Sequence, residues 1–288
     1  MAYRFKARES IPDGVARIAR AQLDGALATL AAPTRGREEQ VHDVRKRIKK
    51  VRALLRLVES ELAGDFAVEN ARLRAISQVL APYRDAAAIV VTFDQLREQY
   101  HGPAAGITAI REELLLEKKR AERQEGLKLA LEDAAGELRR VRKRIKHWPL
   151  RRDSFHVISA GIGKSLHRGR AAMDTALESR HADRFHDWRK RVKDSFYHVR
   201  LLRDIWCEVM TGYQDTLGAL EDKLGRDHDL NLLGDKLRAQ PDLCKYIQSV
   251  QHDLRAEAEP LGLRIYGEKP AKLVRRWERW WNVWKQKR

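Results

Sequence analysis

The amino-acid sequence predicts an all-α protein. Hydrophobic residues recur at three- and four-residue intervals along most of the 288 residues, whereas the short alternating runs that indicate strands are nearly absent. Pro and Gly separate the periodic stretches. Hydrophobic residues make up 43% of the chain, which is enough for a sizeable core. We therefore expect packed helices, without a sheet and without extensive disorder.

Nine helical stretches are expected in chain order. Their approximate residue ranges are 12–30, 38–62, 66–100, 104–146, 153–177, 181–209, 213–239, 241–258 and 269–285. The expected breaks are at Pro33 with Gly36, Gly64, Gly102 with Pro103, Trp148 with Pro149, Gly212, Gln240 with Pro241, and Gly267. Pro82 falls inside the third stretch and should kink or divide that helix.

An internal repeat divides the chain in two. Residues 41–51, VHDVRKRIKKV, recur as residues 185–195, FHDWRKRVKDS, 144 residues later. An Arg-Asp pair, Arg84-Asp85, recurs at nearly the same offset as Arg226-Asp227. This spacing predicts two related four-helix halves, residues 10–148 and 149–288, the second including a Trp-rich C-terminal helix.

On a helix, the first copy of the repeat separates into two stripes. Its apolar seam is Val41, Val44, Ile48, Val51, Leu55 and Val58. The residues that follow the first five are His42, Arg45, Lys49, Arg52 and Arg56, a basic stripe about 100° further round the helix.

The second copy follows the same rule. Its seam is Phe185, Trp188, Val192, Ser195, Val199 and Leu202, and its basic stripe is His186, Arg189, Lys193, Arg200 and Arg203. A solvated helix face would intersperse acidic residues at three- and four-residue spacing. Both stripes nearly lack them, so we favour a ligand-facing surface over a merely solvated one.

Charge indicates an anionic partner. The 58 Lys and Arg residues exceed the 41 Asp and Glu residues, giving a net charge of +17. The N-terminal segment is charged where a signal peptide is apolar, and no run is long enough to span a membrane. We expect a cytoplasmic protein without membrane insertion. Charge alone leaves nucleic acid, an anionic membrane surface and inorganic polyphosphate open.

Catalytic chemistry finds little support in the sequence. The His-Asp pairs at His42, His186 and His228 faintly resemble phosphohydrolase metal ligands, but adjacent helical residues point about 100° apart and the surrounding cations repel metal ions. These cations should also lower the pKa values of His42 and His186, leaving both neutral. Asp85 and Asp227 are expected in buried ion pairs. We therefore expect no enzyme, metal or cofactor.

These motifs together resemble the CHAD family, the conserved histidine α-helical domain. The resemblance rests on residues 41–50 and 52–56, Glu69-Asn70, 83–85, 186–193, 225–229 and 266–270, in order over nearly the whole chain. Ala87 departs from the Arg-Asp-x-Asp pattern that Asp229 completes in the second half.

The resemblance implies a single, stand-alone CHAD domain over residues 10–288. It implies two four-helix bundles related by a pseudo-twofold axis, with a basic channel or surface between them. Family members bind inorganic polyphosphate, and bacterial ones associate with polyphosphate granules. A metal-dependent phosphohydrolase acting on phosphate polymers, or a helical nucleic-acid-binding protein, are the alternatives.

The expected ligand contacts come from the resemblance and from helical spacing. The resemblance implies His42, Arg45, Lys46, Lys49, Arg56, His186, Arg189, Lys190, Lys193 and Arg200. Helical spacing adds Arg52, Arg203, Lys164, His167 and Arg168, with Arg17, Arg20, Arg139 and Lys143 as further candidates. The Trp-rich end could lie on a membrane surface, but we favour its packing onto the bundle.

Overall fold

The computed structural model describes residues 3–32, 36–102, 106–123 and 125–286, without the side chains of residues 122, 123 and 125. Helices account for nearly all of these residues, and none of the residues in these ranges forms a strand. The all-α prediction is therefore confirmed. The expected breaks at Pro33 and Pro103, and the start of the stretch at residue 104, lie outside the described residues.

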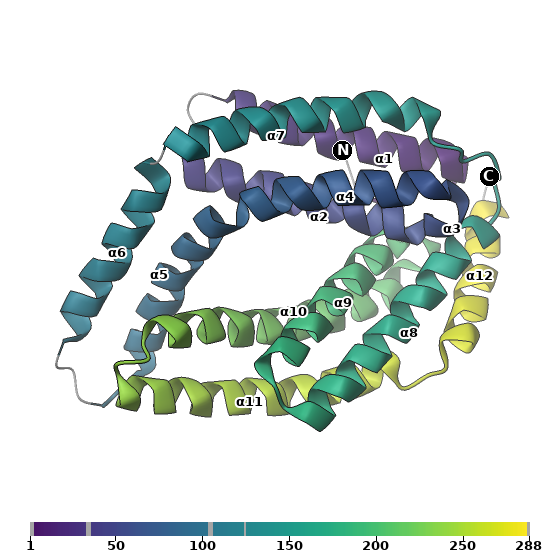
Figure 1. The fold of residues 1–288 in the computed structure, drawn as a ribbon. Coiled ribbons are helices and arrows are strands. Elements are labelled where there is room, and N and C mark those ends of the chain that lie inside the picture. Colours follow the sequence, from purple (N-terminus) through teal and green to yellow (C-terminus); the bar gives the residue numbers. More distant parts are fainter. Residues whose placement is uncertain (1–2, 33–35, 103–105, 124, 287–288) are drawn as a thin grey trace.

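Four long helices of the first half lie side by side (Figure 1). They are α1 (Ile11–Ala31), α2 (Arg37–Leu57), α4 (Gly64–Val79) and α7 (Glu125–Arg144), with the single turn α3 (Glu59–Leu62) after α2. Helix α1 packs on α2 and α7, and α4 packs on the same two helices. The side of α2 that faces this group carries the seam of the first repeat.

The second half contains a further group of helices. It is built from α8 (His156–Ser179), α9 (Ala182–Leu201), α10 (Cys207–Lys236) and α11 (Pro241–Tyr266), followed by α12 (Pro270–Gln286). Short 3-10 turns at Ile145–His147 and Arg203–Ile205 precede α8 and α10. Helix α9 packs between α8 and α10, and α10 packs on α11.

The two halves share their hydrophobic interior. The main core cluster joins side chains of α1, α2, α4 and α7 to those of α8, α9 and α10. Helices α5 (Ala81–Gln99) and α6 (Ile107–Arg123) leave the first group, and a second cluster packs them against α10 and α11. The halves are therefore not independent domains. The exact division at residue 148 and the pseudo-twofold axis stay predictions.

Several helix boundaries differ from the predicted ones. Pro82 divides the third stretch as expected, since it lies in the first turn of α5. The predicted break at Gly212 is wrong, because α10 begins at Cys207 and continues through Gly212. The chain instead breaks at Trp206, whose backbone is extended. A single glycine costs a helix only about 1 kcal/mol, which packing against α9 and α11 outweighs.

Two further predicted stretches each form two helices in the structure, and the predicted stretch 241–258 ends too early. Residues 38–62 are divided between α2 and α3 at Val58, and the stretch from 104 to 146 becomes α6 and α7. Helix α11 continues past Pro260 to Tyr266, eight residues beyond the predicted end at Ala258. The packing of this last part against α8 explains why the proline does not end it.

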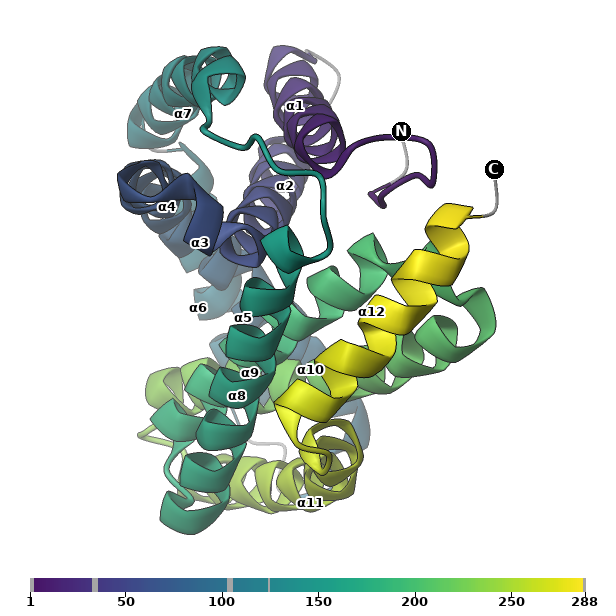
Figure 2. The same ribbon diagram turned by 90° about the vertical axis from the view of Figure 1, so that its right-hand side faces the viewer.

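The tryptophans of α12 pack onto the bundle. Trp277 and Trp281 are 2% and 4% exposed, and Trp281 contacts the rings of Phe5 and Phe155. Helix α12 packs against α8 (Figure 2). The preferred interpretation of the Trp-rich end is confirmed. None of the helices in the described part of the chain is long and apolar enough to cross a membrane.

Close packing of α8 against the end of α2 depends on Gly161. A Cβ atom at Gly161 would lie 2.1 Å from the carbonyl oxygen of Leu57, a backbone atom that cannot rotate away. We expect Gly161→Ala to lower the free energy of unfolding by about 3 kcal/mol, the upper end of ordinary overpacking costs. Urea denaturation measures this change.

The matched control is Gly136→Ala on α7, where an added Cβ meets no atom within 4 Å. Alanine favours the helix there, so we expect stabilisation by about 0.5–1 kcal/mol. Equal effects of the two substitutions would contradict the proposed close contact between α8 and α2.

Candidate anion-binding site

Both seams of the repeat are buried, as predicted. Val41, Val44, Ile48 and Val51 on α2 are at most 1% exposed, and Phe185, Trp188 and Val192 on α9 are fully buried. Burial of a seam fixes the rotation of its helix, because turning the helix would expose apolar surface. The basic stripes are thereby held in defined directions.

The two stripes meet where α2 packs against α9. Burial lowers the pKa of Lys49 to about 7, and the nearby positive charge of Lys193 acts in the same direction. Arg45 and Arg189 add to this effect. The pKa of Lys193 is lowered too, first by burial and then by Arg189. Cations from the two halves of the chain therefore share one partly desolvated place.

A carboxylate from a third helix reaches this place. Glu221 on α10 lies 2.7 Å from the Nζ of Lys193 and 3.9 Å from the Nε of Arg189. Lys49 has no carboxylate within ion-pair distance among the described residues. The site, which we call the Lys49–Lys193 site, thus consists of Arg45, Lys49, Arg189 and Lys193 with Glu221, and it keeps an excess of positive charge.

The histidine of the second repeat stacks on another histidine beside this site. The rings of His186 and His228 lie 3.9 Å apart between centroids and are nearly parallel. Burial first, and then the charges of Lys190 and Arg189, lower the pKa of His186 to about 4. Burial first, and then the neighbouring His186, lower the pKa of His228 to about 3. The Nδ1 of His186 is buried and has no hydrogen-bond partner within the described structure.

The histidine of the first repeat is more exposed. Partial desolvation lowers the pKa of His42, and Arg84 on α5 and Lys46 act in the same direction. The expected direction is therefore found for both repeat histidines. The expected cause was incomplete, because desolvation exceeds the effect of the cations.

Arg45 is held against α4 and α5. Its Nη1 donates a hydrogen bond to the carbonyl oxygen of Ser77, while its Nε is buried and without an acceptor in the described structure. Burial raises the pKa of Asp85 on α5, and the charge of Arg45 opposes that rise. Asp85 therefore lies close enough to Arg45 for their charges to interact, although no ion pair joins them within 4.0 Å in the described residues.

Asp227 forms the buried ion pair that the sequence predicts. Its partner is Arg255 on α11, with Nε 2.7 Å from Oδ1, and the aspartate side chain is 2% exposed. Arg255 also lies over the ring of Phe185. This pair therefore joins α10 and α11 behind the seam of α9.

Predicted contacts further along α2 are paired with acidic or amide groups. Arg52 donates to Asn70, and Arg56 pairs with Asp194 on α9 at 2.9 Å. Glu59 lies 2.5 Å from Lys164 and 4.0 Å from Arg168. A small pocket between α2, α8 and α9 is lined by Arg56, Lys164, Arg168 and Arg191. The stripe that appeared acid-free on its own helix is thus partly neutralised from its neighbours.

The other predicted contacts lie in varied surroundings. Lys46, Lys190 and His167 are exposed, Lys190 pairs with Asp187, and Arg200 and Arg203 are half-buried. Arg20, Arg139 and Lys143 are exposed on α1 and α7, on the opposite side of the molecule from α10 and α11 (Figure 2). Arg17 pairs with Glu9 and bonds the carbonyl oxygen of Arg4, so it fixes the N-terminal segment instead of extending the basic surface.

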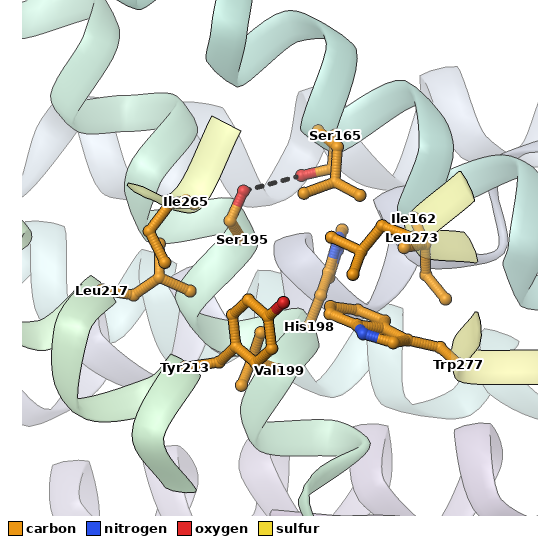
Figure 3. A pocket seen from close by; sticks show the side chains of 11 residues that line it. Ile162, Ser165, Ser195, His198, Val199, Tyr213, Leu217, Ile265, Leu273 and Trp277 are labelled. Carbon is orange, nitrogen blue, oxygen red and sulfur yellow. Dashed lines mark hydrogen bonds between the residues drawn. The ribbon is translucent and has the colours of Figure 1, made fainter. Parts of the chain in front are cut away.

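A separate apolar pocket lies between α8, α9, α10 and α12 (Figure 3). Its Ser195 Oγ is 3.5 Å from Ser165 Oγ and 3.5 Å from the hydroxyl of Tyr266. The Nε2 of His198 bonds the carbonyl oxygen of Ala53 at 2.8 Å. Serine and histidine are therefore engaged with other partners, and the pocket's lining, which contains Trp277 and several aliphatic side chains, is that of a packed interior.

Metal-binding groups are not gathered anywhere in the described ranges. Among these residues, no set of three or more His, Cys, Asp or Glu side chains is placed to hold a metal ion. His228 lies between Asp227 and Asp229 in sequence, but Asp227 pairs with Arg255 and His228 stacks on His186.

Comparison with known proteins gives two matches and one absence. A family model described as the CHAD domain matches residues 17–238. The crystal structure of the CHAD domain from the plant Ricinus communis is similar in fold, with a TM-score of 0.57 and 15% sequence identity, covering 92% of this chain and 95% of that one. No curated protein matches this chain.

Proposed function

Because the chain belongs to the CHAD family, as the match over more than half of its length shows, we propose that it binds long-chain inorganic polyphosphate without cutting it. The family is associated with polyphosphate binding. The proposed contacts are the cations of α2 and α9 that form the Lys49–Lys193 site, together with the exposed Lys46 and Lys190 beside them.

The observation that carries this proposal is the position of Lys49. Its amine is partly desolvated among Arg45, Arg189 and Lys193, and no carboxylate pairs with it in the described structure. Like charges held together in this way destabilise the free protein, and a polyanion would relieve the repulsion. Arginine forks bind phosphate oxygens in pairs and lysines add point charge, so the set suits a ligand with many phosphates.

Calorimetric titration tests the proposal. Long-chain polyphosphate should bind much more tightly, per mole of phosphate, than orthophosphate, and its affinity should fall steeply with salt as counterions are released. Oligonucleotide competition tests the nucleic-acid alternative, which predicts comparable or better affinity for DNA or RNA. Release of orthophosphate upon addition of Mg²⁺ or Mn²⁺ would instead support the phosphohydrolase alternative. No binding at moderate salt would reject the proposal.

The affinity should depend on pH through Lys49. The pKa of Lys49 is about 7 in the free protein, and a bound polyanion favours the charged amine and raises that pKa. Binding therefore takes up a proton above pH 7, and the affinity should fall by up to about tenfold per pH unit from there towards the pKa of the bound state. Calorimetry between pH 6 and pH 9 measures this slope.

Lys49→Arg provides the control for the pH experiment. Arginine keeps its charge throughout this range, so the variant should bind with a flatter pH dependence than the natural protein. The same slope in both proteins would mean that another group takes up the proton.

We further propose a cytoplasmic location at polyphosphate granules. Fluorescence imaging of a tagged chain alongside a polyphosphate stain tests it. A tagged protein that remains away from the stained granules would contradict the proposal.

A further inference from the structure

Glu221 occupies an unusual place for an acidic side chain. It projects from α10 to the cations of α9, and its ion pair with Lys193 is 2.7 Å long. Both side chains are partly buried, with 24% of Glu221 and 21% of Lys193 exposed. Partial burial strengthens the attraction between them relative to a pair at the surface. A ligand that binds Lys193 must therefore compete with a carboxylate that is already there.

The same carboxylate leaves a neighbouring donor unsatisfied. The Nε of Arg189 is buried and has no hydrogen-bond acceptor in the described structure, and it lies 3.9 Å from the nearest oxygen of Glu221. This distance is too long for a hydrogen bond. Glu221 thus offsets the charge of Arg189 without accepting a hydrogen bond from its Nε. An anion oxygen closer to Arg189 would offset the charge and also accept that hydrogen bond.

From this geometry we propose that Glu221 is an internal counter-anion that a ligand must displace before it can bind Lys193 and Arg189, and that it makes the site selective for long phosphate chains over single phosphates. The inference rests on the proposed function and adds a determinant of its specificity. The other charged groups at Glu221 are Lys49 on α2 and the adjacent Asp222 on α10.

The selectivity follows from the number of contacts that each ligand gains. Orthophosphate at Lys193 exchanges one anion for another, so little net attraction remains. A long chain can bind Lys49 and the exposed Lys46 and Lys190 while Glu221 stays on Lys193, so it avoids part of the cost of displacing the carboxylate. Removing the charge of Glu221 should therefore raise the affinity for orthophosphate more than the affinity for a long chain.

The test is Glu221→Gln, which keeps the side-chain shape and removes its charge. We expect the affinity for orthophosphate to rise roughly tenfold, the affinity for long-chain polyphosphate to rise less, and the ratio of the two affinities to fall. The control is Glu117→Gln on α6. It removes the same charge from an ion pair with Lys236 at the far end of α10, and should leave the ratio unchanged.

A second variant separates charge from positioning. Glu221→Asp keeps the carboxylate and should retain the natural preference for long chains. If Glu221 instead served only to position Lys193, Glu221→Gln would bind every ligand more weakly. Unchanged or lower orthophosphate affinity in Glu221→Gln would overturn the inference. Failure of the natural protein to bind polyphosphate would instead reject the proposed function. The orthophosphate affinities of the natural protein and Glu221→Gln would still test the role of Glu221.

Discussion

Replacing Lys49 with glutamate is expected to weaken polyphosphate binding by about 100-fold or more. The substitution removes one cation from the site and adds a charge that repels the ligand. A hydrogen bond to a charged group contributes about 1.5–3 kcal/mol, and each 1.4 kcal/mol corresponds to a factor of about ten in affinity. Isothermal titration calorimetry with long-chain polyphosphate measures the change.

The fold should tolerate this substitution. Lys49 lies off the buried seam, and its positive charge is opposed by Lys193 and Arg189. A carboxylate at position 49 would attract those same cations, so the free energy of unfolding should be unchanged or slightly raised. Lys193→Glu should differ, because it would place a second carboxylate beside Glu221 and so lower the melting temperature.

The control for Lys49→Glu is Lys272→Glu on α12. It makes the same change in net charge at an exposed position outside the two repeats. Its effect on affinity should stay within about threefold, as expected for a screened surface charge. Equal losses of affinity in the two variants would mean that binding depends on net charge and not on the Lys49–Lys193 site.

Replacing Asp227 with alanine should cause a large loss of stability. The substitution leaves Arg255 without its carboxylate in a place where only 18% of its side chain is exposed. Breaking a buried ion pair from one side costs about 3–5 kcal/mol. We expect a loss near the lower figure, because Arg255 keeps its contact with Phe185, and a fall in melting temperature of roughly 6–12 °C.

Two further variants test this explanation. Asp227→Ala combined with Arg255→Met should recover much of the lost stability, since the unpaired charge is removed. Asp235→Ala breaks an exposed pair with Arg238 and should cost at most about 1 kcal/mol. A double variant no more stable than Asp227→Ala would show that the loss arises from packing instead of the unpaired arginine.

The sequence alone predicts the helical class and the orientation of the two central helices. Every residue of both seams is buried, because the three- and four-residue spacing of apolar side chains is a local property that any packing of the helix must satisfy. The break before Pro82 is equally local, since the proline ring determines its own backbone geometry.

Helix ends that depend on packing could not be predicted in this way. Gly212 predicts a helix break, yet α10 continues through it because α10 packs against neighbouring helices along its length. Conversely, no proline or glycine stands at Trp206 to predict the extended backbone that breaks the helix there. The packing of α5 and α6 against α10 is a long-range contact, which the spacing of apolar residues along the sequence does not predict.

The acidic partners of the basic stripes were likewise beyond sequence analysis. Lack of acids along α2 and α9 suggested unpaired cations, but Glu221 comes from α10 and Glu59 from α3. Asp194 is in the second repeat itself, yet it neutralises Arg56 of the first. Only His228 had a visible signal, its place in the repeated Arg-Asp motif, and that signal faintly resembled metal ligands without indicating a stacked pair.

The central claim is that cations of α2 and α9 share one desolvated site that receives a polyanion. NMR titration of the Lys49 side-chain amine, assigned with Lys49→Arg, tests it most directly. We predict a pKa of about 7 in the free protein, and a clearly higher value when the protein is saturated with long-chain polyphosphate. A pKa near the ordinary 10.5 in both states would contradict the claim, because Lys49 would then be a solvated surface amine.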